Sequence, residues 1–278
     1  CMEDNMKNTV LTLTKGLIYS VRSDYLYKKA FTLAEVLITL GIIGVVAAMT
    51  LPALIQKNSE KEIIAKLKKF NSTMNQAFML AKNENGEIET WGLTTAGMVT
   101  DPTEEEQMNN NEVVNKFWDI MSPYLKIISK CKAGTNECKS YERYSLDGTK
   151  FSKFTPYIIL ADGTYIVGTT VASGTCSSSV GTSKQLQHIC GEIFVDVNGK
   201  KAPNKTGEDV FLFYYTKYGF VPMGTGQQTS GFTFEDYCNK RNPSALNGYG
   251  CTAWVIYNEN MDYLHCNDLN WDGKKSCK

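Results

Sequence analysis

One carboxylate, that of Glu35, lies inside an apolar run that extends from Phe31 to Ile55. At about 1.5 Å per residue, a helix of this length crosses the ~30 Å hydrocarbon core of a bilayer. An ionised carboxylate within such a helix costs about 2.5–3.5 kcal/mol at the centre and less near the end. A plain anchor has no use for a group that is kept at this cost. The sequence therefore predicts a transmembrane helix over residues 31–56 with a functional acid near its start.

The residues around this acid follow a fixed spacing. If Phe31 is counted as the first position, Glu35 is the fifth and Pro52 is the twenty-second. Two lysines and Ala30 come immediately before. This pattern resembles the N-terminus of type IV pilins and type II secretion pseudopilins. The resemblance implies that residues 1–30 are a leader, that a prepilin peptidase cleaves after Ala30 and that Phe31 is then N-methylated. Ala30 departs from the glycine that is usual there, but it is also small.

Cleavage would place a new α-amino group at Phe31, at the head of the apolar helix. Glu35 follows by four residues and therefore shares a helix face with this amine, near the positive end of the helix dipole. A cation and a carboxylate attract strongly in a low-dielectric setting. We predict that Glu35 pairs with the amine of a neighbouring subunit and so sets the axial register of a helical bundle. Pairing with the amine of its own chain, or a position at headgroup level without a partner, are the alternatives.

Eight of the nine cysteines follow the apolar run, and none of them has C-x-x-C spacing. An even number without metal-type spacing favours disulfides in an oxidising compartment, and buried free thiols are the alternative. The head that carries them is then expected outside the cytoplasm. Local pairs between Cys131 and Cys138, and between Cys266 and Cys277, are the simplest guesses among the many pairings possible. The eight candidates are Cys131, Cys138, Cys176, Cys190, Cys238, Cys251, Cys266 and Cys277.

The stretch from Asp196 to Asp209 contains the oxygen-bearing side chains that calcium prefers. Some pseudopilins that this chain resembles bind calcium in a loop of the sheet region. The spacing differs from that of an EF-hand, because Lys200 and Gly207 stand where ligands belong. We therefore favour a surface turn whose acids accept backbone hydrogen bonds. Calcium in the 196–209 loop stays open, and no other cofactor or metal is expected.

The residues give no support for an enzyme, and no catalytic residue is predicted. The two histidines, His188 and His265, lie near Cys190 and Cys266, but cysteines held in disulfides cannot act as nucleophiles. Removal of residues 1–30 leaves 24 basic against 26 acidic residues, since the leader holds five and three of the 29 of each sign. This balance argues against nucleic acid as a primary ligand.

The elements that must position these residues begin with one long helix. After Pro52, apolar residues recur at steps of three and four, so residues 57–86 are predicted to continue the helix as an amphipathic segment. The helix is expected to kink at Pro52. It should end at about Asn83, where Asn85 and Gly86 supply a stop signal.

Residues 87–278 are predicted to form the disulfide-containing head. We expect a loop over residues 87–111, including the Glu104–Glu106 acids, and a helix over residues 112–129 kinked at Pro123. An Asp-Gly turn predicts a hairpin over residues 157–167, and further strands are expected over residues 193–196, 210–215 and 220–222. Residues 251–257 fit either a strand or a short helix. The fold class is α+β: a long N-terminal helix packed on an antiparallel sheet, as in pilins.

We interpret the chain as a structural subunit of a type IV pilus-like or type II secretion pseudopilus filament. It is expected to cross the bacterial plasma membrane once, and to reach a surface or periplasmic filament after assembly. Expected partners are other copies, paralogous pilins and the prepilin peptidase whose substrate it is. Two alternatives stay open: a minor tip pilin that binds a ligand or surface, and an anchored extracytoplasmic domain that never polymerises.

Overall fold

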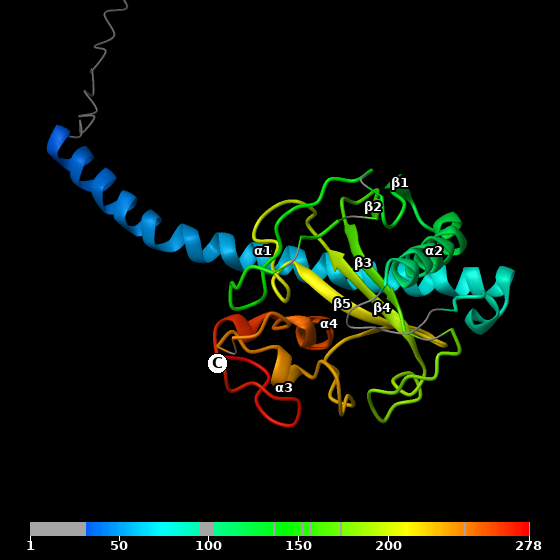
Figure 1. Cartoon of the computed structure of the whole chain (residues 1–278). Helices are drawn as coiled ribbons and strands as arrows, with labels where there is room; N and C mark the ends of the chain where they lie inside the picture. The colour runs from blue at the N-terminus through cyan, green and yellow to red at the C-terminus, as the bar shows by residue number, and fades with distance from the viewer. Residues whose placement is uncertain are drawn as a thin grey trace, which may run out of the picture. The chain divides into compact units, whose positions relative to one another are not determined.

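The computed structural model describes residues 32–94, 103–135, 137–151, 153–155, 157–172, 174–241 and 243–277. The chain divides into two compact units, one that ends at Ala53 and one that extends from Leu54 to Lys278. The first unit contains the start of helix α1 (Leu33–Asn85), and the second contains the remainder of α1 and the whole head. The head is an α+β fold, as the sequence predicts (Figure 1).

The second half of α1 is amphipathic, and its apolar stripe is buried. Seven residues at steps of three and four form this stripe: Ile63, Leu67, Phe70, Met74, Ala77, Phe78 and Ala81. The helix ends at Asn85 because Gly86 adopts a left-handed conformation (φ 80°) and its amide donates to the carbonyl of Lys82. The predicted end at about Asn83 lies within one turn of this position. A short 3-10 turn, η1 (Ile88–Thr90), follows.

The sheet has six antiparallel strands in strict chain order. Its strands are β1 (Ile127–Lys130), β2 (Ile158–Leu160), β3 (Tyr165–Val171), β4 (Ile189–Asp196), β5 (Val210–Thr216) and β6 (Gly219–Pro222). The predicted hairpin is β2–β3, whose turn contains Asp162 and Gly163, the latter at φ 84°. Because all neighbours in the sheet are also neighbours in the chain, no crossover interrupts the face that α1 covers.

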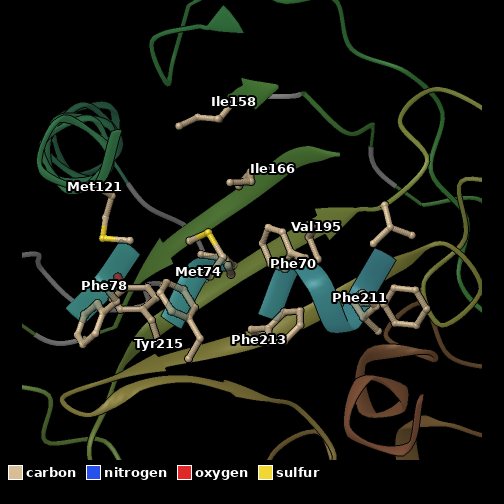
Figure 2. Close-up of a cluster of buried hydrophobic side chains, with 14 of the residues drawn as sticks. Phe70, Met74, Phe78, Met121, Ile158, Ile166, Val195, Phe211, Phe213 and Tyr215 are labelled. Atoms are coloured by element: carbon tan, nitrogen blue, oxygen red, sulfur yellow. The ribbon is translucent and has the colours of Figure 1, made fainter. Parts of the chain in front are cut away.

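The main core lies between α1 and one face of the sheet (Figure 2). On β5, Phe213 and Tyr215 belong to this core, whereas Tyr214 belongs to a second core on the opposite face. The ring of Phe70 lies 5.5 Å from that of Phe213, centroid to centroid. All seven residues of β5 are buried, so this strand is covered on both faces and its sequence is a continuous apolar run rather than an alternating one.

Helix α2 (Glu104–Met121) corrects the prediction for the segment after α1. We predicted a loop through residue 111 and a helix over residues 112–129. The helix instead begins earlier, because Thr103 and Glu106 form a capping box, and the acidic run is its first turn. It also ends earlier, since Pro123 falls in the 3-10 turn η2 (Ser122–Tyr124). Strand β1 then occupies the residues that were expected to be helical.

The C-terminal part of the chain packs beside β5 and β6 with short helices, most of whose buried side chains join the main core. These are α3 (Phe234–Tyr237), η3 (Tyr249–Cys251), α4 (Thr252–Asn258) and η4 (Asp262–Leu264). Residues 251–257, which fitted a strand or a helix, are therefore helical. Buried Thr252 shows why a strand does not form: its hydroxyl accepts from the amide of Leu212 at 2.9 Å and joins α4 to β5 by a side chain.

The outer edge of β6 is closed by a side chain of α1. Asn75 Oδ1 accepts from the amide of Phe220 at 2.9 Å, and Asn75 Nδ2 donates to the carbonyl of Phe220 at 3.3 Å. One amide side chain thus supplies both hydrogen bonds that a further strand would make at this residue. This contact fixes α1 along the sheet and protects an edge that would otherwise pair with other chains.

Candidate assembly site

The carboxylate of Glu35 is held by a capping box at the start of α1. Glu35 Oε2 accepts from the backbone amide and from the hydroxyl of Thr32, both at 2.8 Å, and the Glu35 amide donates to Thr32 Oγ1 at 3.2 Å. Thr32 and Glu35 stand in the T-x-x-E spacing that signals such a box, a signal that our sequence interpretation did not use. Ala30 and Phe31 lie outside the described residues.

The surface of α1 before Gln56 is apolar and exposed. Its most apolar stretch of 18 residues has a mean hydropathy of 2.3, and none of that stretch is buried. Large side chains such as Leu37, Ile43 and Ile55 are each more than 60 % exposed, which soluble folded proteins avoid over so long a stretch. This segment is a transmembrane helix. Among the described residues it is the one helix long and apolar enough to cross a bilayer.

The polar groups inside this segment are satisfied locally. Thr39 donates to the carbonyl of Val36, and Thr50 donates to the carbonyl of Val46, both at 3.0 Å. Pro52 lies inside α1, one residue before the boundary between the two units, and it lacks the amide that would bond four residues back. Among the described residues from Thr32 to Ile55, Glu35 has the one side chain that can carry a charge.

The head contains a second acidic site, which the structure builds from the two ends of the 196–209 loop. Asp196 and Asp209 are both fully buried. Asp209 accepts from the amides of Asn204 and Lys205 and from the side chain of Asn198, at 2.7–3.2 Å. Tyr141, on a distant segment, donates to Asp196 at 2.7 Å. The expected surface turn is thus partly wrong: the acids do accept backbone hydrogen bonds, but they lie inside the domain.

Burial dominates the electrostatics of this pair. It raises the pKa of Asp196 to about 8, with the neighbouring charge of Asp209 as the second cause. Burial also raises the pKa of Asp209 to about 6, against the lowering effect of its hydrogen bonds. The same surroundings raise the pKa of Tyr141 well above its ordinary value. In the part of the chain that the structure describes, no group of three or more acidic, histidine or cysteine side chains is placed to hold a metal ion.

All eight cysteines of the head form disulfides, in four local pairs. The pairs are Cys131–Cys138, Cys176–Cys190, Cys238–Cys251 and Cys266–Cys277. The pairs Cys131–Cys138 and Cys266–Cys277 agree with those suggested from the sequence. The sequence did not indicate a partner for any of the other four cysteines. Sequence separations of 7 to 14 residues mean that each bond closes one short loop.

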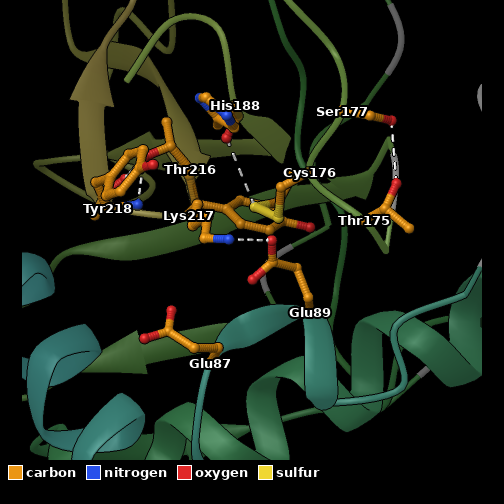
Figure 3. Close-up of a disulfide and its surroundings, with 12 residues drawn as sticks. Glu87, Glu89, Thr175, Cys176, Ser177, His188, Thr216, Lys217 and Tyr218 are labelled. Atoms are coloured by element: carbon orange, nitrogen blue, oxygen red, sulfur yellow. Dashed lines mark hydrogen bonds and ion pairs between the residues drawn. A yellow bond between two sulfur atoms is a disulfide. The ribbon is translucent and has the colours of Figure 1, made fainter. Parts of the chain in front are cut away.

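One of the two histidines, His188, lies beside the disulfide between Cys176 and Cys190 (Figure 3). His188 lies two residues before Cys190, but its ring nitrogen Nδ1 contacts the carbonyl of Lys184 at 2.8 Å. The ring packs against Tyr218, with centroids 5.5 Å apart. The other histidine, His265, contacts Glu60 on α1 at 2.9 Å. Both rings thus serve packing and hydrogen bonding.

A capped, exposed apolar helix that continues into a disulfide-bonded α+β head defines a membrane-anchored protein of pilin-like layout. Comparison with family models agrees, because the prokaryotic N-terminal methylation motif matches residues 26–51. This match supports the resemblance of the N-terminus to type IV pilins and type II secretion pseudopilins. The chain belongs to the family of unknown function DUF6613, whose model matches residues 53–260. No curated protein and no solved structure matches it significantly.

Proposed function

We propose that this chain is a structural subunit of a type IV pilus-like or type II secretion pseudopilus filament. The observation that carries the proposal is Glu35 at the start of an exposed apolar helix, inside a matched N-terminal methylation motif. The chain is made with a leader, cleaved between Ala30 and Phe31 by a prepilin peptidase and methylated at Phe31. It is the substrate of that reaction and a structural protein, with other copies or paralogous pilins as its partners.

The capping box supplies a physical route from membrane to filament. While the subunit is single, Thr32 satisfies the carboxylate of Glu35 with two hydrogen bonds, which reduces the cost of holding it at the membrane. In the filament, the amine of a neighbouring Phe31 offers a full opposite charge in a setting from which water is excluded. When the carboxylate of Glu35 leaves Thr32 and pairs with that amine, the new ion pair sets the register between adjacent helices.

The proposal also includes the side of the membrane on which the head lies. The four disulfides support an oxidising compartment for the head, and in this proposal the head lies outside the cytoplasm and the single span crosses the bacterial plasma membrane. Lysines stand on both sides of the apolar segment, so charge bias alone does not set this orientation.

N-terminal peptide mass spectrometry of the membrane fraction tests the processing step. The full chain is expressed with and without a prepilin peptidase. We expect an N-terminus at Phe31 that carries an added methyl group only with the peptidase. A chain that keeps residues 1–30 under both conditions would remove the main support for the proposal.

Glu35→Ala tests the assembly step. We expect membrane insertion to persist while the amount of filament recovered by shearing falls at least tenfold. Glu62→Ala is the matched control, because Glu62 is an exposed acid of the same helix that pairs with Lys66 at 2.8 Å. Equal filament yields from Glu35→Ala and the control would show that Glu35 has no role in assembly, and no filament from the wild type would indicate an anchored domain that does not polymerise.

A further inference from the structure

Four exposed lysines lie near the start of the head, two on α1 and two on the turn that follows β4. Lys57 and Lys61 lie on α1, and Lys200 and Lys201 lie in the turn after β4; all four are exposed. Among the described residues, none of these four ammonium groups forms an ion pair. We call these four residues the basic collar.

The turn of the collar lies against α1 across a hollow of about 460 Å³. The wall of the hollow includes Lys66 of α1, Asp162 of the β2–β3 turn, and Lys200 and Lys201. Lys66 is paired with Glu62, and Asp162 is paired with Lys69 at 3.0 Å. These charges cancel, so the hollow keeps the two positive charges of the turn.

The collar is also close to the apolar segment along the helix. At about 1.5 Å per residue, Lys57 and Lys61 lie about 3 and 9 Å beyond Ile55. The charge of Lys201 contributes to lowering the pKa of Glu62, after the larger effect of Lys66, so the turn lies beside the same part of the helix. The headgroup layer of a bilayer is about 5–7 Å thick on each side, and charges act over about 8 Å at physiological ionic strength. By this measure Lys57 and Lys61 fall within reach of lipid phosphates, and Lys200 and Lys201 lie beside the part of α1 that follows them.

We propose that the basic collar binds the phosphate groups of anionic phospholipids and holds the head against the membrane surface while the subunit is single. Among nearby acids, Glu62 is paired with Lys66, whereas Glu60 contacts His265, which is charged only when protonated; the four positive charges of the collar exceed the single charge of Glu60. The proposal rests on the membrane anchorage in the proposed function but not on polymerisation. Entry into a filament must break these lipid contacts, so the collar sets a cost that assembly has to overcome.

Native mass spectrometry of the full chain in detergent micelles tests the proposal, with phosphatidylglycerol, phosphatidylcholine and inorganic phosphate as probes. Two lysines near a membrane surface contribute about a 25-fold change in affinity, at about fivefold each. We expect K200Q/K201Q to raise the apparent Kd for phosphatidylglycerol by about that factor. K57Q/K61Q, on the other side of the collar, should have a similar effect.

K132Q/K139Q is the matched control. Both lysines are exposed, neither forms an ion pair among the described residues, and they flank the Cys131–Cys138 disulfide at the end of β1 away from the Asp162 turn. The control should bind phosphatidylglycerol like the wild type. The proposal is overturned if phosphatidylcholine binds equally well, if the control loses as much affinity as K200Q/K201Q, or if inorganic phosphate alone competes fully at millimolar concentration. E35A should keep its lipid affinity, which separates this test from that of assembly.

Discussion

The buried pair Asp196 and Asp209 makes an unusual pH dependence of stability predictable. An aspartate in the unfolded chain ionises near pH 3.9. In the folded head, the pKa of Asp196 is raised to about 8 and that of Asp209 to about 6. The folded state therefore holds protons that the unfolded state has released. Retention of these protons stabilises the folded state fully below about pH 4, and this stabilisation is lost as the pH rises through about 6 and about 8.

Two buried acids titrate between pH 6 and pH 8, because above pH 6 the loss from Asp209 is largely complete, whereas Asp196 and Glu192, whose pKa burial raises to about 7, still lose their protons. Each pKa unit corresponds to about 1.4 kcal/mol, so linkage gives a loss of about 2 kcal/mol of unfolding free energy from Asp196 alone across this window. For a domain of this size, that loss lowers the Tm by roughly 4–8 °C. Asp196→Asn removes the titration while its amide oxygen can still accept from Tyr141. We expect its Tm to fall by less than that of the wild type between pH 6 and 8, because only the titration of Glu192 remains, and to exceed that of the wild type at pH 8.

Thermal unfolding of the full chain in detergent, followed by circular dichroism at both pH values, measures this. Asp268→Asn is the control, since Asp268 is exposed and its pKa is lowered by its hydrogen bond with Lys274. Its titration falls below this window, so the control should keep the wild-type slope. A wild-type Tm that rises or stays level from pH 6 to pH 8 would refute the reasoning, as would an Asp196→Asn variant with an unchanged slope.

Three further outcomes follow from the head. Cys238→Ser/Cys251→Ser should lower the unfolding free energy by about 3 kcal/mol in urea, because it opens a short loop; a loss below 1 kcal/mol would contradict this. Asn75→Ala should cost about 1–3 kcal/mol in the same assay, because the edge amide of Phe220 loses its partner; no change would show that the edge contact is dispensable. Millimolar calcium should leave the Tm unchanged, because the oxygens of Asp209 already accept from the loop's own donors, and a clear rise would reverse this view.

Much of the fold could be predicted because its signals are local. The apolar stripe of α1, the Asp-Gly turn before β3 and the apolar run of β5 each depend on residues within one element. The error at α2 had a local signal too, since Thr103 and Glu106 carry the capping spacing that marks its start. The run of acids from Glu104 to Glu106 favoured a solvated loop in the prediction, whereas it forms the first turn of α2.

The remaining features depend on contacts between distant segments, which no local pattern contains. Tyr141 meets Asp196 only after the sheet has formed, and Asn75 meets Phe220 only when α1 lies in its final register. The interior position of the acid pair was missed for this reason, because Asp and Asn beside glycine are typical of exposed turns. Glu35 itself was found from its spacing, whereas its bond to Thr32 needed the helix start to be placed.

The strict chain order of the sheet has a consequence for how the head folds. Each strand pairs with the one made just before it, and each disulfide joins cysteines at most 14 residues apart. Loop-closure costs are therefore small at every step, and pairing can advance along the chain as it emerges. The exception is α1, which is made first but whose rings Phe70 and Phe78 contact Phe213 and Phe220, near the end of the sheet. The apolar face of the helix is therefore not fully covered until β5 and β6 arrive, so a chain that stops after β4 leaves part of the core open and should not reach the folded state.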